Sequence, residues 1–431
     1  MQSLLFSLNR VAVIGLVYSS ARMLIGATSA VYLLSKGISA SEVGVMKSFQ
    51  ALLLMLLEFP LGVLADRKGR RICLILGGLA GAAWLSLTAA SSSLWMLLLA
   101  EGFNALSMAS FNGAFDALLA ERYIAERGRP LLNKLLGDYH AVLFSLMALF
   151  SLVGGTFVSP TSSLFWWIAS AIILLGTGFV PLLIHSDKPI KAPGSVHENT
   201  IRSSGLFKLL KGEFAVVFSI ILTRSELRKV ALPFIVVSVF YQLLIPYWQL
   251  FFLGSETNQF PLFGFDLTFF GPVFFSILMV QSLASKTLSS RKFTNLSERM
   301  LQLGLAVCAA LLAAAVYWRG SLILSVVALL AVFALVRFYT LRASAHIHNL
   351  VDDSRRASVL SALSVSTRVA LVVILPASGY MIGMIGVWIL PLLGALLGGI
   401  LVLSEALSHG PLRLLRQCST AEAGEGQASS G

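Results

Sequence analysis

Charged residues are scarce in this chain of 431 residues. Asp, Glu, Lys and Arg make up 12% of it, whereas soluble globular proteins contain about 25%. Hydrophobic residues make up 57%, and the mean hydropathy is +0.85. This composition excludes a soluble protein with a large core. It indicates a chain that crosses a membrane many times.

Cysteine is almost absent, and Cys73, Cys308 and Cys418 are widely separated. No C-x-x-C motif occurs, so neither a disulfide framework nor a thiolate metal site is expected. His346 and His348 have no acidic or thiol partner nearby in sequence, and no metal site is predicted there either. The G-x-x-x-x-G-K-S/T loop of ATP-binding proteins is missing, as is any cluster of a nucleophile with a base. The sequence therefore predicts no cofactor and no enzyme.

Acidic residues are outnumbered, since 20 Asp and Glu stand against 32 Lys and Arg, for a net charge of +12. A basic chain can bind nucleic acid, but these cations are confined to a few connections between apolar runs. Lys and Arg gather on the cytoplasmic side of membrane proteins. The charge pattern thus indicates membrane topology, and no nucleic-acid partner is expected.

Apolar runs of about 20 residues, the length that spans a bilayer, fall into two sets of six separated by a polar stretch. With a cytoplasmic N-terminus, the odd-numbered connections hold little more than Lys36 and Arg319 among the cations. The other connections hold nearly all the rest, which predicts twelve spans with both termini in the cytoplasm. The predicted spans are 11–35, 41–65, 70–90, 93–120, 137–159, 163–185, 229–254, 264–287, 298–318, 321–345, 358–382 and 385–407.

This pattern divides the chain into four parts. Residues 1–185 and 229–408 each form a six-helix bundle, and 186–228 form a cytoplasmic central linker. Within the linker, apolar residues at helical spacing from Ile201 to Ile221 predict an amphipathic helix on the inner leaflet, with a disordered tether as the alternative. The tail 409–431 is small and polar and is predicted to be disordered and cytoplasmic.

The most informative motif joins the second and third spans. Residues 62–71 read G-V-L-A-D-R-K-G-R-R and follow Glu58-Phe59-Pro60. The run resembles the G-x-L-A-D-R-x-G-R-K/R loop of the major facilitator superfamily, and of its bacterial members in particular. The resemblance implies an all-α fold of twelve transmembrane helices in two six-helix bundles. It also implies a gating loop, with Asp66 paired to Arg70 or Arg71, made of Gly62, Asp66, Arg67, Gly69, Arg70 and Arg71.

The fourth span carries polar residues that a bilayer does not favour. Glu101, Asn104, Asn112 and Asp116 recur at helical spacing and so share one face of the helix. Residues 112–119 also resemble the S-G-A-x-E-A-L-L pattern of one bacterial branch, with Asp116 in place of the glutamate. We expect this face to line a central cavity, the alternative being hydrogen bonds between helices.

Other intramembrane polar residues are candidates for the same cavity. Arg22 lies in the middle of the first span, where it can pair with Glu101 or meet an anionic substrate. Glu58 is a candidate proton site, or a structural hydrogen-bond acceptor. The second bundle contributes the candidates Tyr241, Gln242 and Arg337.

The resemblance implies a secondary active transporter working by alternating access. Proton-coupled efflux of a small organic solute, a drug or a siderophore-like metabolite, is the leading expectation, with Glu101 or Asp116 as the coupling residue. Uptake of an anionic metabolite by a symporter or facilitator is an alternative, motivated by Arg22 and Arg337, and a sensor that does not transport is another. The expected partners are a small-molecule substrate, protons and the lipid bilayer of a bacterial inner membrane, in which the chain is expected to be a monomer.

One feature departs from the proton-coupled antiporters. Their fifth helix often carries G-x-x-x-G-P-x-x-G-G, and here the run ends in Gly154-Gly155 but has Phe150 and Ser151 in place of G-P. The antiport mechanism is therefore not settled by this motif.

Overall fold

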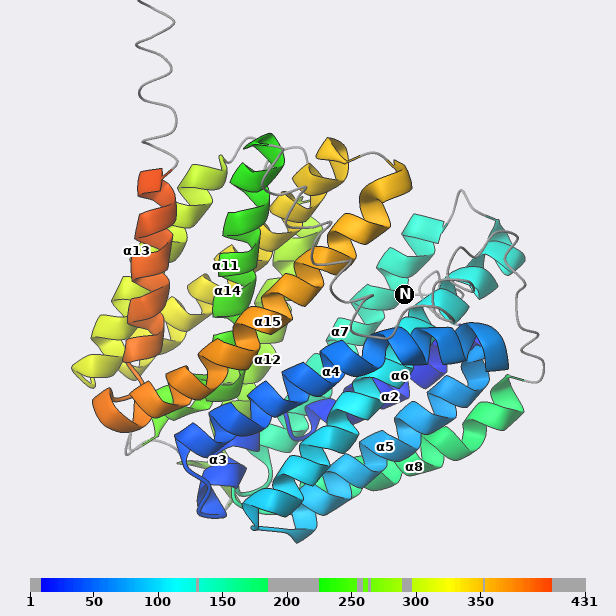
Figure 1. The fold of residues 1–431 in the computed structure, drawn as a ribbon. Coiled ribbons are helices and arrows are strands. Elements are labelled where there is room, and N and C mark those ends of the chain that lie inside the picture. The colour runs from blue at the N-terminus through cyan, green and yellow to red at the C-terminus, as the bar shows by residue number, and fades with distance from the viewer. Residues whose placement is uncertain are drawn as a thin grey trace, which may run out of the picture.

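The computed structural model describes residues 9–128, 132–184, 225–253, 259–262, 265–288, 297–351 and 353–404. Helices dominate these residues and form two bundles that lie side by side (Figure 1). Most of the predicted linker and the whole predicted tail lie outside the described residues.

The first bundle is built around α5, which packs between α6 and α8. Close packing needs small residues there. A Cβ atom at Gly78 of α5 would meet the Thr177 hydroxyl of α8. The helices of this bundle are α2 (Arg10–Met23), α3 (Ser29–Ser35), α4 (Ala40–Lys68), α5 (Arg70–Ala90), α6 (Leu94–Arg127), α7 (Leu132–Thr156) and α8 (Leu164–Leu183).

The second bundle begins with α11, which packs on α14 and α15. Its helices are α11 (Ser225–Tyr247), the 3-10 helix η2 (Trp248–Phe252), α12 (Phe270–Leu288), α13 (Glu298–Tyr317), α14 (Leu322–Leu350), α15 (Asp353–Ile385) and a last helix over Ile389–Ser404. Gly386, with a φ of 111°, makes the turn before that last helix.

The twelve predicted spans are all found. Nine helices of the described residues are long and apolar enough to cross a membrane, and two shorter apolar helices, Phe270–Ala284 and Ile389–Ser404, add to them. The broken pair α2 and α3 supplies the twelfth. The prediction of an all-α membrane fold in two six-helix bundles is therefore confirmed.

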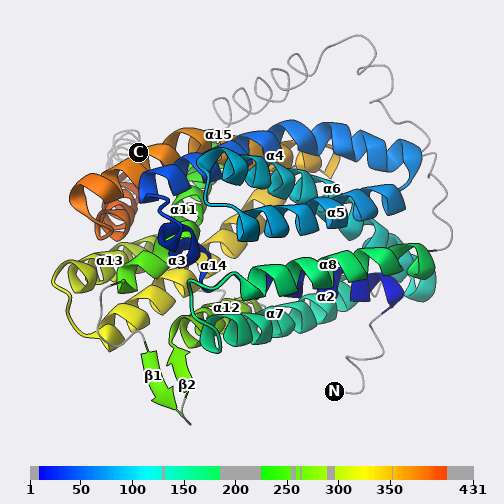
Figure 2. The same ribbon diagram turned by 90° about the horizontal axis from the view of Figure 1, so that it is seen from below.

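Two of the differences from the predicted spans change the secondary structure and not only a helix end. The first span is not one helix over 11–35, because Leu24–Thr28 form turns with i to i+3 hydrogen bonds between α2 and α3. The eighth helix begins at Phe270 and not at 264, because β1 (Gln259–Leu262) and β2 (Phe265–Thr268) form an antiparallel hairpin in the connection from α11. Figure 2 shows this hairpin projecting beyond the helices. Both segments are apolar, so hydropathy does not separate them from helix.

The bundles contact each other along two helix pairs, α4 with α15 and α7 with α12. Figures 1 and 2 both show α4 and α15 lying side by side between the bundles. Ser48 of α4 donates a hydrogen bond to the Val372 carbonyl of α15 at 2.6 Å, and Ser41 donates to the Gly379 carbonyl at 3.2 Å. These contacts lie toward the start of α4, where it follows α3.

In the second helix pair, α7 and α12 come into close contact at two glycines. A Cβ at Gly155 of α7 would stand 2.7 Å from the backbone of Gly271 of α12, and Thr268 donates a hydrogen bond to the Gly155 carbonyl. We call the end of the molecule where α3 meets α4, and where these contacts gather, the sealed end. The opposite end carries the connection from α4 to α5, and we call it the loop end.

Gly271→Val is expected to force α7 and α12 apart and to destabilise the protein by about 1 to 3 kcal/mol, the usual effect of overpacking. Thermal unfolding of the purified protein in detergent measures the change. Gly178→Val on the outer face of α8, where a Cβ meets no atom within 4 Å, is the matched control. Equal shifts in the two variants would contradict close contact between α7 and α12.

Candidate substrate cavity

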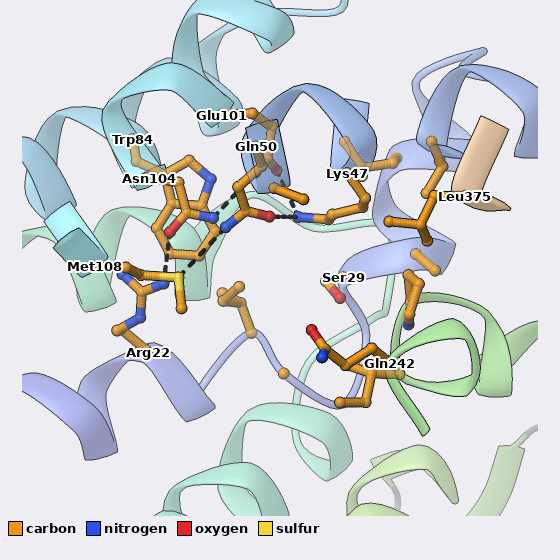
Figure 3. Close-up of a pocket in the computed structure, with 18 of the residues that line it drawn as sticks. Arg22, Ser29, Lys47, Gln50, Trp84, Glu101, Asn104, Met108, Gln242 and Leu375 are labelled. Atoms are coloured by element: carbon orange, nitrogen blue, oxygen red, sulfur yellow. Dashed lines mark hydrogen bonds and ion pairs between the residues drawn. The ribbon is translucent and has the colours of Figure 1, made fainter. Parts of the chain in front are cut away.

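A cavity of about 330 Å³ lies between the two bundles. Ligand sites commonly enclose about 300 to 1,000 Å³, so it is large enough for a small organic molecule. Helices α2 to α6, with Trp166 of α8, form one wall, and α11, α12 and α15 form the other. Figure 3 shows the polar side chains of the first wall, with Gln242 and Leu375 on the opposite side.

The polar face of α6 points into this cavity through Glu101 and Asn104, both 2% exposed. Oε1 of Glu101 accepts from the Lys47 ammonium of α4 at 2.7 Å, and Oε2 accepts from the Asn104 amide at 3.0 Å. A buried carboxylate is stable only when its charge is paired and its oxygens are hydrogen-bonded. Lys47 and Asn104 together meet that requirement.

Arg22 of α2 joins the same network through Asn104. Its Nη2 donates to Oδ1 of Asn104 at 2.6 Å, and its Nη1 donates to the Tyr18 hydroxyl at 3.3 Å. The guanidinium also lies over the ring of Trp84, 4.4 Å from the centroid, where the ring face attracts a cation. Arg22 is thus held in place by three neighbours and contacts Glu101 only through Asn104.

The network continues on both sides. Beyond Arg22, the Tyr18 hydroxyl lies 2.6 Å from the Ser107 hydroxyl, which donates to the Gly77 carbonyl of α5. Beyond Lys47, the ammonium contacts Gln50 at 3.5 Å, and the Gln50 amide points at the Met108 sulfur (Figure 3). Four helices of the first bundle are therefore tied together at the cavity wall.

The two walls differ in character. The first bundle brings Arg22, Lys47 and Glu101, which leaves one positive charge in excess. The second bundle brings Arg368, whose charge is balanced by Glu58 of α4. The remainder of that second wall is chiefly apolar and includes Ile245, Pro246, Phe274, Leu371 and Leu375.

Comparison with known proteins decides the family. The sequence profile described as Major Facilitator Superfamily matches residues 11–341. The chain belongs to the major facilitator superfamily. It is therefore an integral membrane protein of a transporter family.

Solved structures of several transporters share the fold. The nucleoside transporter NupG superimposes with a TM-score of 0.66 at 13% identity, over 92% of this chain and 97% of that one. A peptide transporter POT in complex with sulfate gives 0.68 at 15% identity, over 94% of both chains. A POT family transporter in complex with 5-aminolevulinic acid gives 0.66 at 13%, over 92% and 95%. No curated protein matches this chain in sequence.

The cavity brings together four of the predicted cavity residues, Arg22, Glu101, Asn104 and Gln242. Asn112 and Asp116 share the α6 face but are exposed farther toward the loop end, outside the lining of the cavity. The remaining two belong to the second bundle and do not line it either. Tyr241 donates to Gln281 of α12 at 3.1 Å and packs edge-on against Phe333, and Arg337 of α14 lies near Tyr241.

The predicted gating loop has a different pairing from the expected one. Asp66 and Arg67 are exposed, and Arg70 pairs with Glu121 of α6 at 2.5 Å. Gly69 ends α4 with a φ of 93°, a conformation that favours glycine. Within the described part of the chain, no atom lies within 4 Å of a Cβ built at Gly62, so this glycine allows no close packing there in this conformation.

Sequence reasoning overlooked Arg368 and assigned no role to Lys47 or Trp84. Lys47 and Arg368 carried a usable signal, because each is a cation inside an apolar span and such groups need a partner or a cavity. Trp84 carried no such signal, since an aromatic residue in a membrane helix is ordinary. Its contact with a cation depends on which side chain lies over the ring, and the sequence does not give that.

Lys47→Met is expected to destabilise the protein by about 3 to 5 kcal/mol, because it leaves the Glu101 carboxylate buried without a countercharge. Lys47→Met combined with Glu101→Leu removes both charges and is expected to recover most of the loss. Thermal unfolding of the purified variants measures both effects. A double variant no more stable than Lys47→Met alone would show that the ion pair does not hold this wall together.

Proposed function

We propose that this chain is a proton-coupled secondary transporter that exports a small organic solute by alternating access. The observation that carries the proposal is the buried ion pair of Glu101 and Lys47 on the wall of the cavity between the bundles. In this fold, a site between the two halves is exposed to each side in turn as the halves rock. The proposal places the chain as a monomer in a bacterial inner membrane.

Glu101 suits a coupling role because its protonation changes the contacts of several helices at once. A proton on the carboxylate removes the countercharge of Lys47 and frees the ammonium within the cavity. The hydrogen bond from Asn104 also weakens, because an ionised acceptor binds a donor more strongly than a neutral one. Asn104 in turn accepts a hydrogen bond from Arg22, so protonation of Glu101 alters contacts on α4, α6 and α2.

The seal between the bundles supports alternating access. The contacts of Ser41 and Ser48 with α15, and the close approach of Gly155 and Gly271, gather at one end. The distribution of Lys and Arg supports a cytoplasmic position for the loop end and for both termini. The sealed end is then the outside, and the conformation is closed to the outside. Asp116, exposed on α6 toward the loop end, is a second candidate proton site on the cytoplasmic route.

Solute and direction rest on two different observations. The apolar wall of Ile245, Pro246 and Phe274 opposite the charged wall favours an amphipathic organic molecule over an inorganic ion. Export rests on the resemblance of residues 112–119 to one bacterial branch of the superfamily that is rich in exporters.

Glu101→Gln is expected to abolish solute flux driven by a pH gradient, because the amide cannot take up and release a proton. The assay is protein in liposomes with an imposed gradient and an internal pH-sensitive dye, screened against a panel of drugs and metal-chelating metabolites. Asp116→Asn tests the second site in the same way. Glu298→Gln, whose carboxylate pairs with the exposed His346 away from the cavity, is the control. If Glu101→Gln and Asp116→Asn both retain pH-driven flux, neither is the coupling residue.

Uptake of an anionic metabolite is the second candidate, and the state of Arg22 favours it. Among the residues that the structure describes, its guanidinium bonds to an amide and a hydroxyl and to no carboxylate, so none of them neutralises its charge by direct contact. Together with Lys47 and Glu101 it leaves the cavity wall positive. A carboxylate or phosphate of a substrate would balance that charge.

For an anionic substrate, Arg22→Gln is expected to raise KM about tenfold or more, since a hydrogen bond to a charged group contributes about 1.5 to 3 kcal/mol. Arg22→Lys keeps the charge, and its KM is expected to lie between the values of the wild type and of Arg22→Gln. Initial uptake rates in liposomes at several substrate concentrations measure the effect. An unchanged KM for anions in Arg22→Gln would remove this candidate.

A further inference from the structure

Gln249 of η2 crosses between the bundles and is completely buried, with 0% of its surface exposed. Its Oε1 accepts from the backbone N–H of Ala30 at 2.7 Å and of Val31 at 3.3 Å. Its Nε2 donates to the carbonyl of Gly26 at 3.1 Å. One side chain of the second bundle therefore satisfies three backbone groups of the first.

These three groups flank the break between α2 and α3. Ala30 and Val31 are in the first turn of α3, where backbone N–H groups have no partner within the helix. The residue before a helix commonly supplies a side-chain oxygen to them, but the side chain of Thr28 makes no such bond. Gln249 takes that role from the other bundle.

The surroundings hold Gln249 in this position. Trp248 stacks on Phe274 of α12, with ring centroids 5.5 Å apart and an interplanar angle of 12°, and contacts Phe270 edge-on. Because the glutamine has no surface exposed to water, water cannot take the place of its protein hydrogen-bond partners while the bundles are together. Gly26 and Ala30 also line the cavity, so the break that Gln249 holds is part of the cavity wall.

We propose that Gln249 is a positioning residue that locks the sealed end, by capping α3 from the opposite bundle only while the bundles are together. When this end opens, the amide leaves Ala30, Val31 and Gly26, and those groups pass to the water that enters. The capping bonds thus stabilise the sealed state relative to the open one and fix the cavity wall formed by the break. This inference requires alternating access, but it requires neither a particular solute nor a coupling ion.

The test measures the opening directly. Successive helices run in opposite directions, so the exposed Ser92, between α5 and α6, and Ser321, before α14, both lie at the sealed end on different bundles. Spin labels on Ser92→Cys and Ser321→Cys, in full-length protein with Cys73, Cys308 and Cys418 replaced by serine, report the distance between the bundles. Pulsed electron resonance in lipid nanodiscs gives the ratio of long to short distances.

Gln249→Leu is expected to raise the ratio of open to sealed molecules about tenfold, because two buried N–H groups and a carbonyl lose their partners only in the sealed state. Gln249→Glu keeps an acceptor for Ala30 and Val31 but buries a carboxylate without a countercharge beside the Gly26 carbonyl, so it is also expected to favour the open state. Gln249→Asn, shorter by one carbon, is a milder change that is expected to shift the ratio in the same direction if the leucine variant does not fold.

The matched control is Gln302→Leu. Gln302 is also buried, at 3% exposed, but it contacts Tyr339 within the second bundle and not across the interface. It is expected to lower stability without changing the distance distribution. Equal distributions in wild type, Gln249→Leu and Gln249→Asn would overturn the proposal, and so would an equal shift in Gln302→Leu. These outcomes do not depend on transport, so they leave the proposed function to its own test.

Discussion

The need to pair charge away from water organises this molecule. Glu101 is buried in the wall between two membrane-spanning bundles, where an unpaired carboxylate is costly, and its two oxygens are taken by Lys47 and Asn104. Asn104 also accepts from Arg22. The pairing therefore fixes α2, α4 and α6 relative to one another and gives the first bundle a rigid polar surface. Because so many contacts depend on the charge of one carboxylate, a change in its protonation reaches the whole wall.

The interface between the bundles follows a different principle. At the sealed end it consists of hydrogen bonds to backbone carbonyls and of glycines that allow close approach, as between Ser48 and Val372 and between Gly155 and Gly271. Farther along α4 the two bundles are joined by the ion pair of Glu58 and Arg368. The neutral hydrogen bonds at the sealed end exchange readily for bonds to water, so their net contribution to the free energy of holding the bundles together is modest. An interface made of them can hold the bundles together and still separate at moderate cost.

Sequence reasoning reached the fold and part of the site. Hydropathy and the placement of Lys and Arg were sufficient for twelve spans, because both follow from the bilayer itself. The polar stripe of α6 predicted a cavity-facing surface with Glu101 and Asn104, and both line the cavity between the bundles, since helical periodicity fixes which residues share a face. The same stripe could not tell that Asn112 and Asp116 lie beyond the cavity, because periodicity gives the direction of a side chain around the helix and not how far along the helix the cavity extends.

One expected partner of Arg22 was Glu101, and in the structure Asn104 lies between them. The break at Leu24–Thr28 was invisible because the Gly26 carbonyl and the first N–H groups of α3 find their partner in Gln249, more than 200 residues away.

The difference between the two walls bears on how solute and proton can affect one another. Under the proposed function, charge changes would act on the first bundle, where Arg22, Lys47 and Glu101 lie, and an apolar part of a solute would gain its contacts on the second, at Phe274 and Leu375. A solute that touches both walls bridges the bundles, and the strength of that bridge depends on whether Glu101 holds Lys47 or leaves it free. A ligand shifts a conformational equilibrium only through a difference in its affinity for the two states. Here the protonation state of Glu101 alters the charge of the first wall, and the separation of the bundles alters the distance to the second wall. The affinity for the solute therefore depends on both the proton and the separation. Coupling then needs no direct contact between solute and proton.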